Sequence, residues 1–422
     1  MKSTKNLFGT ILMVFLILSG FASIFVTPVQ AVTTQSVDLS SIINCGDPSL
    51  QATCSISWWT YDSVNNVAWA SVGTCSDTCE DALYKASLST LLTSPSTSIT
   101  QYLNILPHAV APYGSVANGF AAGVMLNGYL WVTGWYSNNS ISVSQVNSNG
   151  VLVNQFFYSG PTNARAITTD GTKLIVGASG KILTMTQAGV FSVLVTVSGD
   201  VKDLKLSGST LWFTQNGATG LGKVNTDGSG LEQLSCSCSG GTFLEIIASN
   251  KWFTSNIDHT LIRYDGSSFT SFSTGLAGDG PYGLNYDSKR NGIWVLGFAN
   301  KVSRFFDLAT SAIDATKDVT SAKKPFMGVN DNSDNVWIIA KGSSEVTKIN
   351  APISTTTTTS TITSTGTSTS VSGTSTSTTT TTTTITSTFV TEVSLTHSGF
   401  GGLPSYTPQV MPVIQVNSTG IA

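Results

Sequence analysis

The feature that most constrains the fold is a short motif that recurs through the middle of the chain. A tight turn, often Asn-Gly or Asp-Gly, precedes a short apolar strand centred on one large side chain. Such turns supply the positive φ angles that two-residue hairpin loops need, so each motif indicates the second strand of a hairpin. We call the central side chains the anchor residues. They are Trp69, Trp131, Ile175, Trp212, Trp252, Trp294 and Trp337.

A multi-stranded unit surrounds each anchor residue. About eight to twelve residues after the anchor comes a further strand, and a more polar fourth strand often follows, as at 151–157. After a longer first interval the motif returns about every 40 residues, and four antiparallel strands in such a period are typical of a β-propeller blade. We therefore predict an all-β fold, a seven-bladed β-propeller with four-stranded antiparallel blades that spans residues 32–352.

The third strand of most repeats carries a basic residue just before an apolar one. These basic residues would form a charged track on the surface, or they are ordinary outward-facing strand positions. Their regular recurrence favours the second interpretation. The pairs are Lys85-Ala86, Lys223-Val224, Arg263-Tyr264, Arg304-Phe305 and Lys348-Ile349.

The seventh repeat lacks an outer strand, because the chain leaves the repeat region at Ala351-Pro352 soon after Lys348-Ile349. The segment 32–43 precedes the first repeat and belongs to none. Exposed sheet edges invite pairing with other chains, and joining these two segments removes two edges at once. We predict that residues 32–43 close the ring by pairing with the blade that contains Trp337.

The first 31 residues have the pattern of a signal peptide. Lys2 and Lys5 precede an uncharged apolar run from Leu7 to Val26, and Val29-Gln30-Ala31 offers a small-residue cleavage site. The run is also just long enough to cross a bilayer, so an uncleaved membrane-spanning signal is the alternative. We expect a secreted, extracellular or cell-surface protein, whose membrane contact is confined to an uncleaved N-terminal segment.

Residues 353–388 are predicted to form a stalk. From Ser354 to Thr388, 30 of 35 residues are Ser or Thr. Burial of so little apolar surface cannot offset the conformational entropy that the segment would lose on ordering. We therefore predict an extended or disordered, O-glycosylated stalk. A bare flexible linker is the alternative. The tail 389–422 has no apolar run of spanning length, so we expect no C-terminal membrane anchor.

The cysteines indicate an oxidising compartment. An even number of cysteines in an exported chain favours disulfides, although the sequence does not fix the pairing. Proximity suggests that the first two pair and that the next two pair, while the last two share one face of a predicted strand. The disulfide candidates are Cys45, Cys54, Cys75, Cys79, Cys236 and Cys238, and the N-glycosylation candidates are Asn138 and Asn417.

Charge excludes one class of partner. The formal net charge is −3, from 20 Lys+Arg and 23 Asp+Glu, so the chain lacks the basic footprint of a nucleic-acid-binding protein. Only 10% of residues are charged, and solubility must therefore come from uncharged polar groups and glycans. Such a surface changes little in charge as the pH falls, which suits an acidic exterior.

Two repeats carry a family resemblance. The block Leu211-Trp212-Phe213-Thr214 returns as Lys251-Trp252-Phe253-Thr254, and each is followed by a basic–apolar strand. These repeats resemble those of virginiamycin B lyase (streptogramin lyase), over about residues 55–350. The resemblance implies a seven-bladed propeller whose central face holds a divalent metal and a His/Glu cluster, which linearise a cyclic depsipeptide antibiotic by elimination.

The family's catalytic set is missing at the matching positions. In the family each block typically runs on into Glu, which can act as a base or bind a hard cation. The residues at that position are here Val72, Gly134, Ala178, Gln215, Ser255, Gly297 and Ala340, and the histidines are His108, His259 and His397. We therefore expect no catalytic residues, no metal and no cofactor. The alternative is a carbon–oxygen lyase with a divergent active site and Mg²⁺.

Polar loops and nearby aromatic side chains should surround the central face of the ring. Their side chains offer paired donors and acceptors that suit sugar hydroxyls or peptide backbone, and aromatic rings can stack on a ligand. Ordinary solvated loops are the alternative interpretation. The ligand-binding candidates are Trp135, Asn139, Gln215, Asn216, Asn256, Asp258, His259 and Asn300.

These features lead to two functional hypotheses. The first is a monomeric, secreted or surface-displayed propeller that acts as a binding or adhesion module for a glycan or protein ligand. The stalk, the low charge and the exported cysteines are similar in style to surface proteins of thermoacidophilic archaea and of the viruses that infect them. The second is a lyase-like enzyme. The stalk and the missing carboxylates favour the first.

Overall fold

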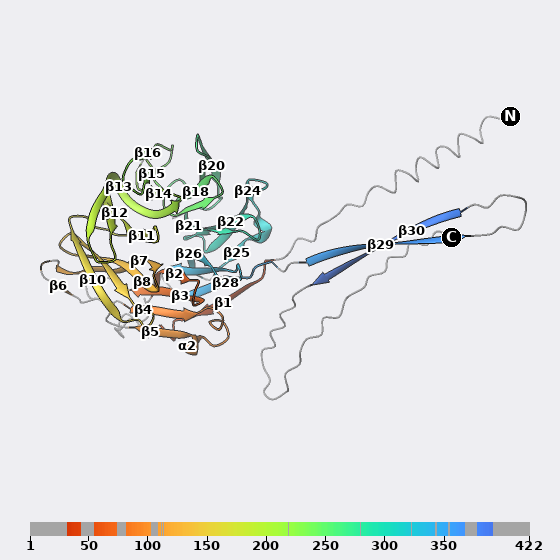
Figure 1. Ribbon diagram of the computed structural model, residues 1–422, viewed down its shortest axis with the longest axis horizontal. Coiled ribbons are helices and arrows are strands. Elements are labelled where there is room, and N and C mark those ends of the chain that lie inside the picture. Colours follow the sequence, from red (N-terminus) through yellow and green to blue (C-terminus); the bar gives the residue numbers. More distant parts are fainter. Residues whose placement is uncertain are drawn as a thin grey trace, which may run out of the picture.

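The computed structural model describes residues 32–43, 55–73, 82–102, 109–110, 112, 114–217, 219–278, 280–321, 323–341, 344–352, 355–367 and 378–390. Most of these residues form antiparallel sheets arranged as a β-propeller (Figure 1). The prediction of an all-β propeller built from four-stranded antiparallel blades is confirmed. In the described residues the propeller contains six sheets, so the predicted number of seven blades is wrong.

The first two sheets follow the expected succession of hairpins. The first joins β2 (Ser55–Asp62), β3 (Val67–Gly73), β4 (Ala82–Ser87) and β5 (Ile99–Tyr102) in that order, with the short helix α2 (Pro95–Ser98) before its outer strand. The second joins β10 (Leu152–Ser159), β9 (Ser140–Val146), β8 (Tyr129–Tyr136), β7 (Gly114–Leu126) and β6 (Ala109–Val110).

The third sheet explains the lower number of blades. It joins β11 (Ala166–Thr169), β12 (Leu174–Met185), β13 (Phe191–Ser207), β14 (Thr210–Gln215), β15 (Leu221–Asn225) and β16 (Glu232–Leu234). This sheet contains two anchor residues, Ile175 and Trp212. Two repeats of the sequence therefore share one six-stranded sheet.

Strand β13 joins the two repeats. It is 17 residues long, and it pairs with β12 between Phe191 and Asp200 and with β14 between Val201 and Ser207. It therefore ends one repeat and begins the next without a turn. A Cβ atom at Gly199 would lie 2.5 Å from the carbonyl oxygen of Asn216, so the missing side chain lets the strand run straight past its neighbour.

Two further sheets precede the closing one. The fourth joins β17 (Leu244–Ile247), β18 (Asn250–Ser255), β19 (Thr260–Tyr264) and β20 (Phe269–Ser273). The fifth joins β21 (Pro281–Asp287), β22 (Gly292–Gly297), β23 (Val302–Asp307) and β24 (Ala312–Ile313). Strand β25 (Val319–Thr320), which follows the 3₁₀ turn η2 (Ala315–Lys317), also pairs with β23.

The last sheet contains both ends of the repeat region. Strand β1 (Thr34–Asp38) pairs antiparallel with β28 (Glu345–Ile349), which is followed by β27 (Val336–Lys341) and β26 (Lys324–Asn330). The Oγ atoms of Ser36 and Thr347 lie 2.9 Å apart across this pair, and the N–H of Asn350 donates to the carbonyl oxygen of Thr33 at 3.0 Å. The predicted closure by the N-terminal strand is confirmed.

The anchor residues form the core between neighbouring repeats. Trp69, Trp131, Trp294 and Trp337 are fully buried. Trp337 packs in one cluster with Trp59 of the first sheet, which ties the last sheet to the first. Its Nε1–H donates to Asp331 Oδ2 at 2.7 Å, and Trp294 Nε1–H donates in the same way to Asp287 Oδ2 at 3.0 Å.

Four of the five recurring basic residues cover the anchor rings, whereas Arg304 lies opposite Val295. Lys85, Lys223, Arg263 and Lys348 lie directly opposite Trp69, Trp212, Trp252 and Trp337 in the strand register. Each cation lies 5.4 to 5.8 Å from the centroid of its ring. Such cation–π contacts are each worth about 0.5–1 kcal/mol at exposed sites. Neither sequence interpretation included this role.

The Ser/Thr-rich tract is extended in its described residues. Strand β29 (Thr355–Thr367) pairs antiparallel with β30 (Thr378–Val390), so this part of the predicted disordered stalk forms a two-stranded ladder. Threonine is β-branched and favours extended backbone. Outside the described residues lie the signal segment 1–31, Cys45, Cys54, Cys75, Cys79, His108 and Asn417. Among the described helices, none has the length and apolarity to cross a bilayer.

The closing strand should contribute measurably to stability. Val37 of β1 is partly buried against the Trp337 cluster, whereas Gln35 on the same strand is exposed. We predict that Val37→Asp lowers the free energy of unfolding by about 2 kcal/mol, because a carboxylate replaces a packed side chain. Gln35→Asp is the control and should cost less than about 0.5 kcal/mol. Equal decreases in the free energy of unfolding of the two variants, measured with urea, would contradict this role for β1.

The cation–π contacts can be tested at Lys348, whose Nζ lies 5.5 Å from the centre of the Trp337 ring. We predict that Lys348→Gln lowers the free energy of unfolding by about 0.5–1 kcal/mol, because the ring loses its covering cation. Lys301→Gln removes an exposed lysine and serves as the control. A difference between these two variants below the error of thermal unfolding would exclude a stabilising contact.

Candidate functional site

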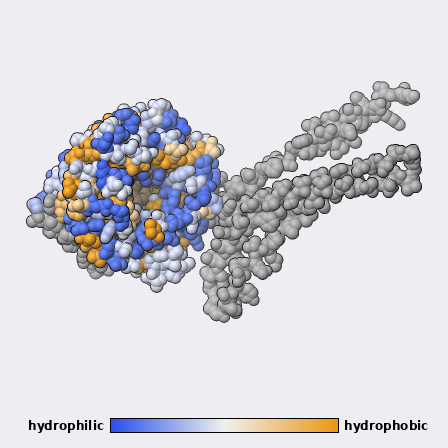
Figure 2. Space-filling model, in the orientation of Figure 1, coloured by the Kyte–Doolittle hydropathy of each residue, from blue (hydrophilic) through white to orange (hydrophobic). Residues whose placement is uncertain are grey.

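A cavity of about 540 Å³ runs through the centre of the propeller. Its lining comes from β2, β7, β11, the second half of β13, β17, β21 and β26, so every sheet contributes its innermost strand. Figure 2 shows the hollow near the middle of the propeller. We call this cavity the central channel.

Four lining side chains share one end of the channel. In each repeat the inner strand, which lines the channel, pairs antiparallel with the anchor strand, which carries the anchor residue. The start of the inner strand therefore lies opposite the end of the anchor strand, as in the pairs Val201↔Gln215 and Lys324↔Lys341. Arg165 precedes β11, Lys202 begins the second half of β13, and Trp135 and Lys341 stand near the ends of β8 and β27. We call Trp135, Arg165, Lys202 and Lys341 the channel mouth.

Aromatic rings lie beneath the cations of this end. The guanidinium of Arg165 lies 5.6 Å from the centre of the Trp135 ring. The Nζ of Lys341 lies 4.9 Å from the Phe326 ring and 6.0 Å from the Tyr282 ring. These contacts position the alkyl stems while the charged groups remain available, because cations are attracted to the faces of aromatic rings.

Positive charge is in excess at the channel mouth. Burial and the charge of Arg165 together lower the pKa of Lys202, and the same two causes lower the pKa of Lys341. Among the described residues Asp200 is the one counter-ion in salt-bridge distance, with its Oδ2 3.5 Å from Lys202 Nζ. Within the described residues, neither Arg165 nor Lys341 lies in salt-bridge distance of a carboxylate.

A second charged cluster lies further along the channel. Glu245 Oε1 is 3.7 Å from Lys205 Nζ, and this carboxylate raises the pKa of Lys205 to about 12. Asp203 accepts hydrogen bonds from the N–H groups of Leu204 at 2.8 Å and Leu244 at 2.9 Å. Burial raises the pKa of both Asp203 and Glu245.

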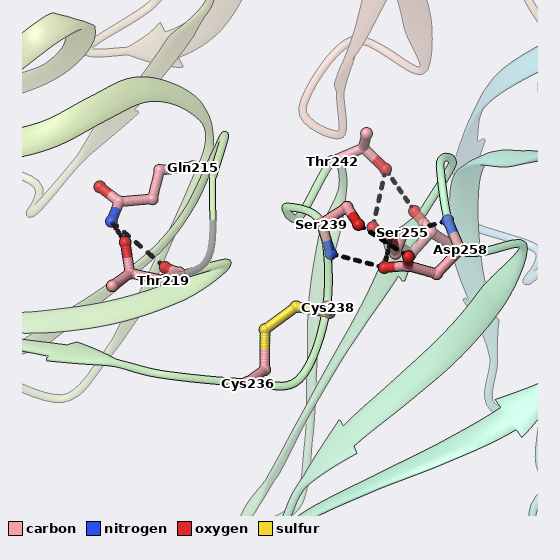
Figure 3. The surroundings of a disulfide bond; sticks show 9 residues. Gln215, Thr219, Cys236, Cys238, Ser239, Thr242, Ser255 and Asp258 are labelled. Atoms are coloured by element: carbon pink, nitrogen blue, oxygen red, sulfur yellow. Dashed lines mark hydrogen bonds between the residues drawn. A yellow bond between two sulfur atoms is a disulfide. The ribbon is translucent and has the colours of Figure 1, made fainter.

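The predicted binding residues are mostly part of the scaffold. Of these candidates, only Trp135 lines the channel. Gln215 is fully buried, and its Nε2 donates to the carbonyl oxygen of Thr219 at 3.2 Å (Figure 3). The same Nε2 also donates to Gln233 Oε1 at 3.0 Å. Asn216 is exposed and pairs with Gly240 in an isolated bridge.

The neighbours Asp258 and His259 are directed to different partners. Asp258 accepts from the N–H of Ser239 at 2.6 Å and from Ser255 Oγ at 2.8 Å (Figure 3). Burial raises the pKa of Asp258, but these hydrogen bonds outweigh burial and hold it below its usual value. His259 adopts a φ of 58° and accepts through its carbonyl oxygen from Thr274 Oγ1 at 2.7 Å.

The other candidates lie in turns. Asn139 is exposed with a φ of 50°, and Asn256 is partly buried. Exposed Asn300 accepts at Oδ1 from the N–H of Ala277 at 3.1 Å, and the sequon residue Asn138 donates to the carbonyl oxygen of Pro112 at 2.7 Å. These contacts set loop geometry.

Cys236 and Cys238 are joined by a disulfide (Figure 3). A Cβ atom at Gly220 would lie within 2.9 Å of both sulfur atoms, so only glycine leaves room for the bridge against β15. The bridge lies outside the lining of the channel.

Sequence reasoning missed the charged residues of the channel. Arg165 and Lys202 both stand at the start of an inner strand, and Lys324 does so in the last repeat. Comparing charges at this one position across the repeats would have found Arg165 and Lys202, but not Lys341, which ends an anchor strand. Among the described residues, no group of three or more His, Cys, Asp or Glu side chains is placed to hold a metal ion.

Comparison with known proteins gives a fold and no family. No family model and no curated protein matches the sequence. Among solved structures, virginiamycin B lyase of Staphylococcus aureus has a TM-score of 0.58 at 14% identity, over 76% of this chain and 99% of that one. An inactive variant of that enzyme with quinupristin gives the same values. A streptogramin B lyase structure gives 0.57 at 14% identity, over 76% and 97%.

At this level of identity the similarity is one of fold. The virginiamycin B lyase-like propeller predicted from the repeats of Trp212 and Trp252 is therefore supported as an architecture. Function must be argued from the side chains of the channel, because one fold supports many unrelated activities.

The acidic cluster in the channel predicts a pH effect on stability. Because the pKa of folded Asp203 is raised above 3.8, ionising it in the folded protein opposes folding at neutral pH. We predict that Asp203→Asn gains stability relative to the parent protein as the pH rises from 3 to 7. Below about pH 3 the parent's Asp203 is protonated in both the folded and the unfolded state, so the difference levels off.

Asp265→Asn is a control for which we expect the opposite change of stability with pH. Hydrogen bonds from the N–H groups of Ser268 and Ser267 lower the pKa of Asp265, so its contribution to stability is present at neutral pH and fades as the pH falls below 3.8. Asp265→Asn should therefore lose stability relative to the parent as the pH rises. Urea unfolding at several pH values measures both variants, and parallel pH profiles would contradict the assignment.

Proposed function

We propose that the protein is a secreted or surface-displayed β-propeller that binds its ligand, a glycan or protein group, at the channel mouth. The observation that carries this proposal is a central channel of about 540 Å³ lined by aromatic and charged side chains. Ligand sites in proteins are commonly concave, with volumes of about 300–1,000 Å³ and a few convergent polar groups.

The lining supplies donors as well as charge. Trp58 and Trp59 are buried in the channel wall and supply part of its apolar surface. Arg165 and Lys341 add donors that cannot accept. A ligand rich in acceptor oxygens fits this set, and sugars and peptide carbonyls both provide such oxygens.

Display supports the same function. The expected signal peptide, stalk and N-glycosylation at Asn138 and Asn417 describe a protein held outside the cell or virion, where binding or adhesion is useful. Strand β1 and residue Asn350 lie side by side at the closure, so the stalk follows directly from the last sheet. We propose a monomeric propeller, since the channel is built from one chain.

A carbon–oxygen lyase is the second candidate, and one observation favours it. Asp203 and Glu245 have raised pKa values beside Lys205, so a carboxyl group there is suited to hold or release a proton. The channel mouth does not suit the magnesium ion that the resemblance implies, because Arg165, Lys202 and Lys341 repel a divalent cation. A lyase reaction here would depend on side chains alone.

The binding proposal predicts saturable binding to a glycan array or to purified surface-layer proteins by the full secreted chain. Trp135→Ala removes an aromatic wall of the mouth and should weaken binding at least about ten-fold. Asn300→Ala, at an exposed loop, is the control and should leave it unchanged. Absence of binding on all supports would overturn the proposal. Release of a linear product from quinupristin that is lost in Asp203→Asn would establish the lyase instead.

A further inference from the structure

We propose that the channel mouth is an anion-recognition site and that its ligand presents a carboxylate or sulfate group on a saccharide. This inference rests on the proposed function, because it names the chemistry of the ligand bound there. It depends on the convergence of Arg165, Lys202 and Lys341 at one end of the channel.

The three cations come from three separate strands. Arg165 precedes β11, Lys202 lies on β13 and Lys341 ends β27. The charge of Arg165 acts on both lysines and helps to lower their pKa values, so the three groups lie close enough to repel each other. Folding has gathered like charges that the sequence spaces widely, and an oxyanion between them would relieve their repulsion.

The protein neutralises only part of this charge. Asp200 lies 3.5 Å from Lys202 and also accepts from Ser179 Oγ. No second carboxylate of the described residues pairs with Arg165 or Lys341. In a chain whose net charge is −3, a local excess of cations stands out against the rest of the molecule.

The surroundings make the cations effective. Arg165 lies over Trp135, and Lys341 lies over Phe326 and Tyr282, so apolar rings replace water on one side of each charge. Arg165 and Lys341 are nevertheless exposed, so a ligand from solution can reach both charges. Guanidinium presents a planar pair of N–H donors that matches a carboxylate or sulfate, and the two ammonium groups add charge at the other oxygens.

Saccharides fit the remaining wall. The rings of Trp135, Tyr282 and Phe326 line the channel and offer apolar faces beside the charged donors. A sugar ring presents both C–H faces and hydroxyl oxygens, so it can meet the two kinds of group at once. An acidic sugar adds the charge that the cations select.

The test compares oligosaccharides that differ only in charge. Isothermal titration of the full chain with glucuronate oligomers, sulfated glucose oligomers and neutral glucose oligomers of equal length gives three dissociation constants. We expect at least ten-fold tighter binding of one charged series than of the neutral series, and the charged arm that binds identifies the group. Affinity should fall several-fold as sodium chloride rises, since salt screens exposed charges.

Variants expected to weaken binding, together with one expected to strengthen it, separate an effect of charge from misfolding. Arg165→Gln and Lys341→Gln should each weaken binding of the charged oligomer about ten-fold. Arg165→Lys keeps the positive charge and should lose less affinity for that oligomer. Asp200→Asn removes the one counter-ion and should strengthen binding, a gain that a damaged fold cannot produce. Lys301→Gln removes an exposed lysine from the turn between β22 and β23, at the same end of the propeller, and should change nothing.

The outcomes distinguish this inference from the function on which it rests. Equal binding of charged and neutral oligomers that still depends on Trp135 would overturn the anion site and leave the binding function standing. Binding of no oligomer by the parent protein, together with no binding to the array, would overturn both. Weaker binding in Asp200→Asn would also contradict the anion site.

Discussion

The ladder between β1 and β28 is the contact on which the rest of the structure depends. It builds the last sheet from both ends of the repeat region, and that sheet carries Trp337 into a core shared with Trp59 of the first sheet. Every sheet supplies an inner strand to the channel wall. Because the wall is continuous only while the ring is closed, five residue pairs far from the channel maintain the shape of the binding site.

Only 10% of the residues are charged, and the fold places the basic ones in two kinds of position. The basic residues of the third strands, such as Lys348, lie over the anchor rings and stabilise the sheets. Those at the starts of inner strands, such as Arg165 and Lys202, converge on the channel. Basic residues thus have two roles. The role of each depends on whether its strand lies inside a sheet or at the axis of the ring. Asp203 and Glu245 balance part of the inner set, at the cost of raised pKa values.

Local sequence signals predicted the fold well and the site poorly. Turns before Trp294 and Trp337 are short-range features, so the hairpins could be derived from them. The closure by residues 32–43 followed from a missing outer strand after Ile349. The number of sheets could not be derived, because it depends on β13 continuing unbroken through Gly199 from one repeat into the next. The channel mouth joins Arg165 to Lys341, which only ring closure brings together. Loop residues such as Asn300 were chosen for their chemistry, but their hydrogen bonds serve the turns in which they lie.

The closure also determines how the propeller is fastened. Thr34 lies opposite Ile349 in the antiparallel register, so the chain enters and leaves the ring at the same point on its rim. A pull between these two chain ends acts on one end of the β1–β28 ladder and opens its pairs one after another, beginning at Thr34. The sheet that carries Arg165 and Lys202 lies outside this load path, whereas Lys341 stands on β27 of the closing sheet itself. Mechanical force on the tethers therefore acts first on the β1–β28 ladder, and it reaches the channel mouth through the neighbouring strand β27, which carries Lys341.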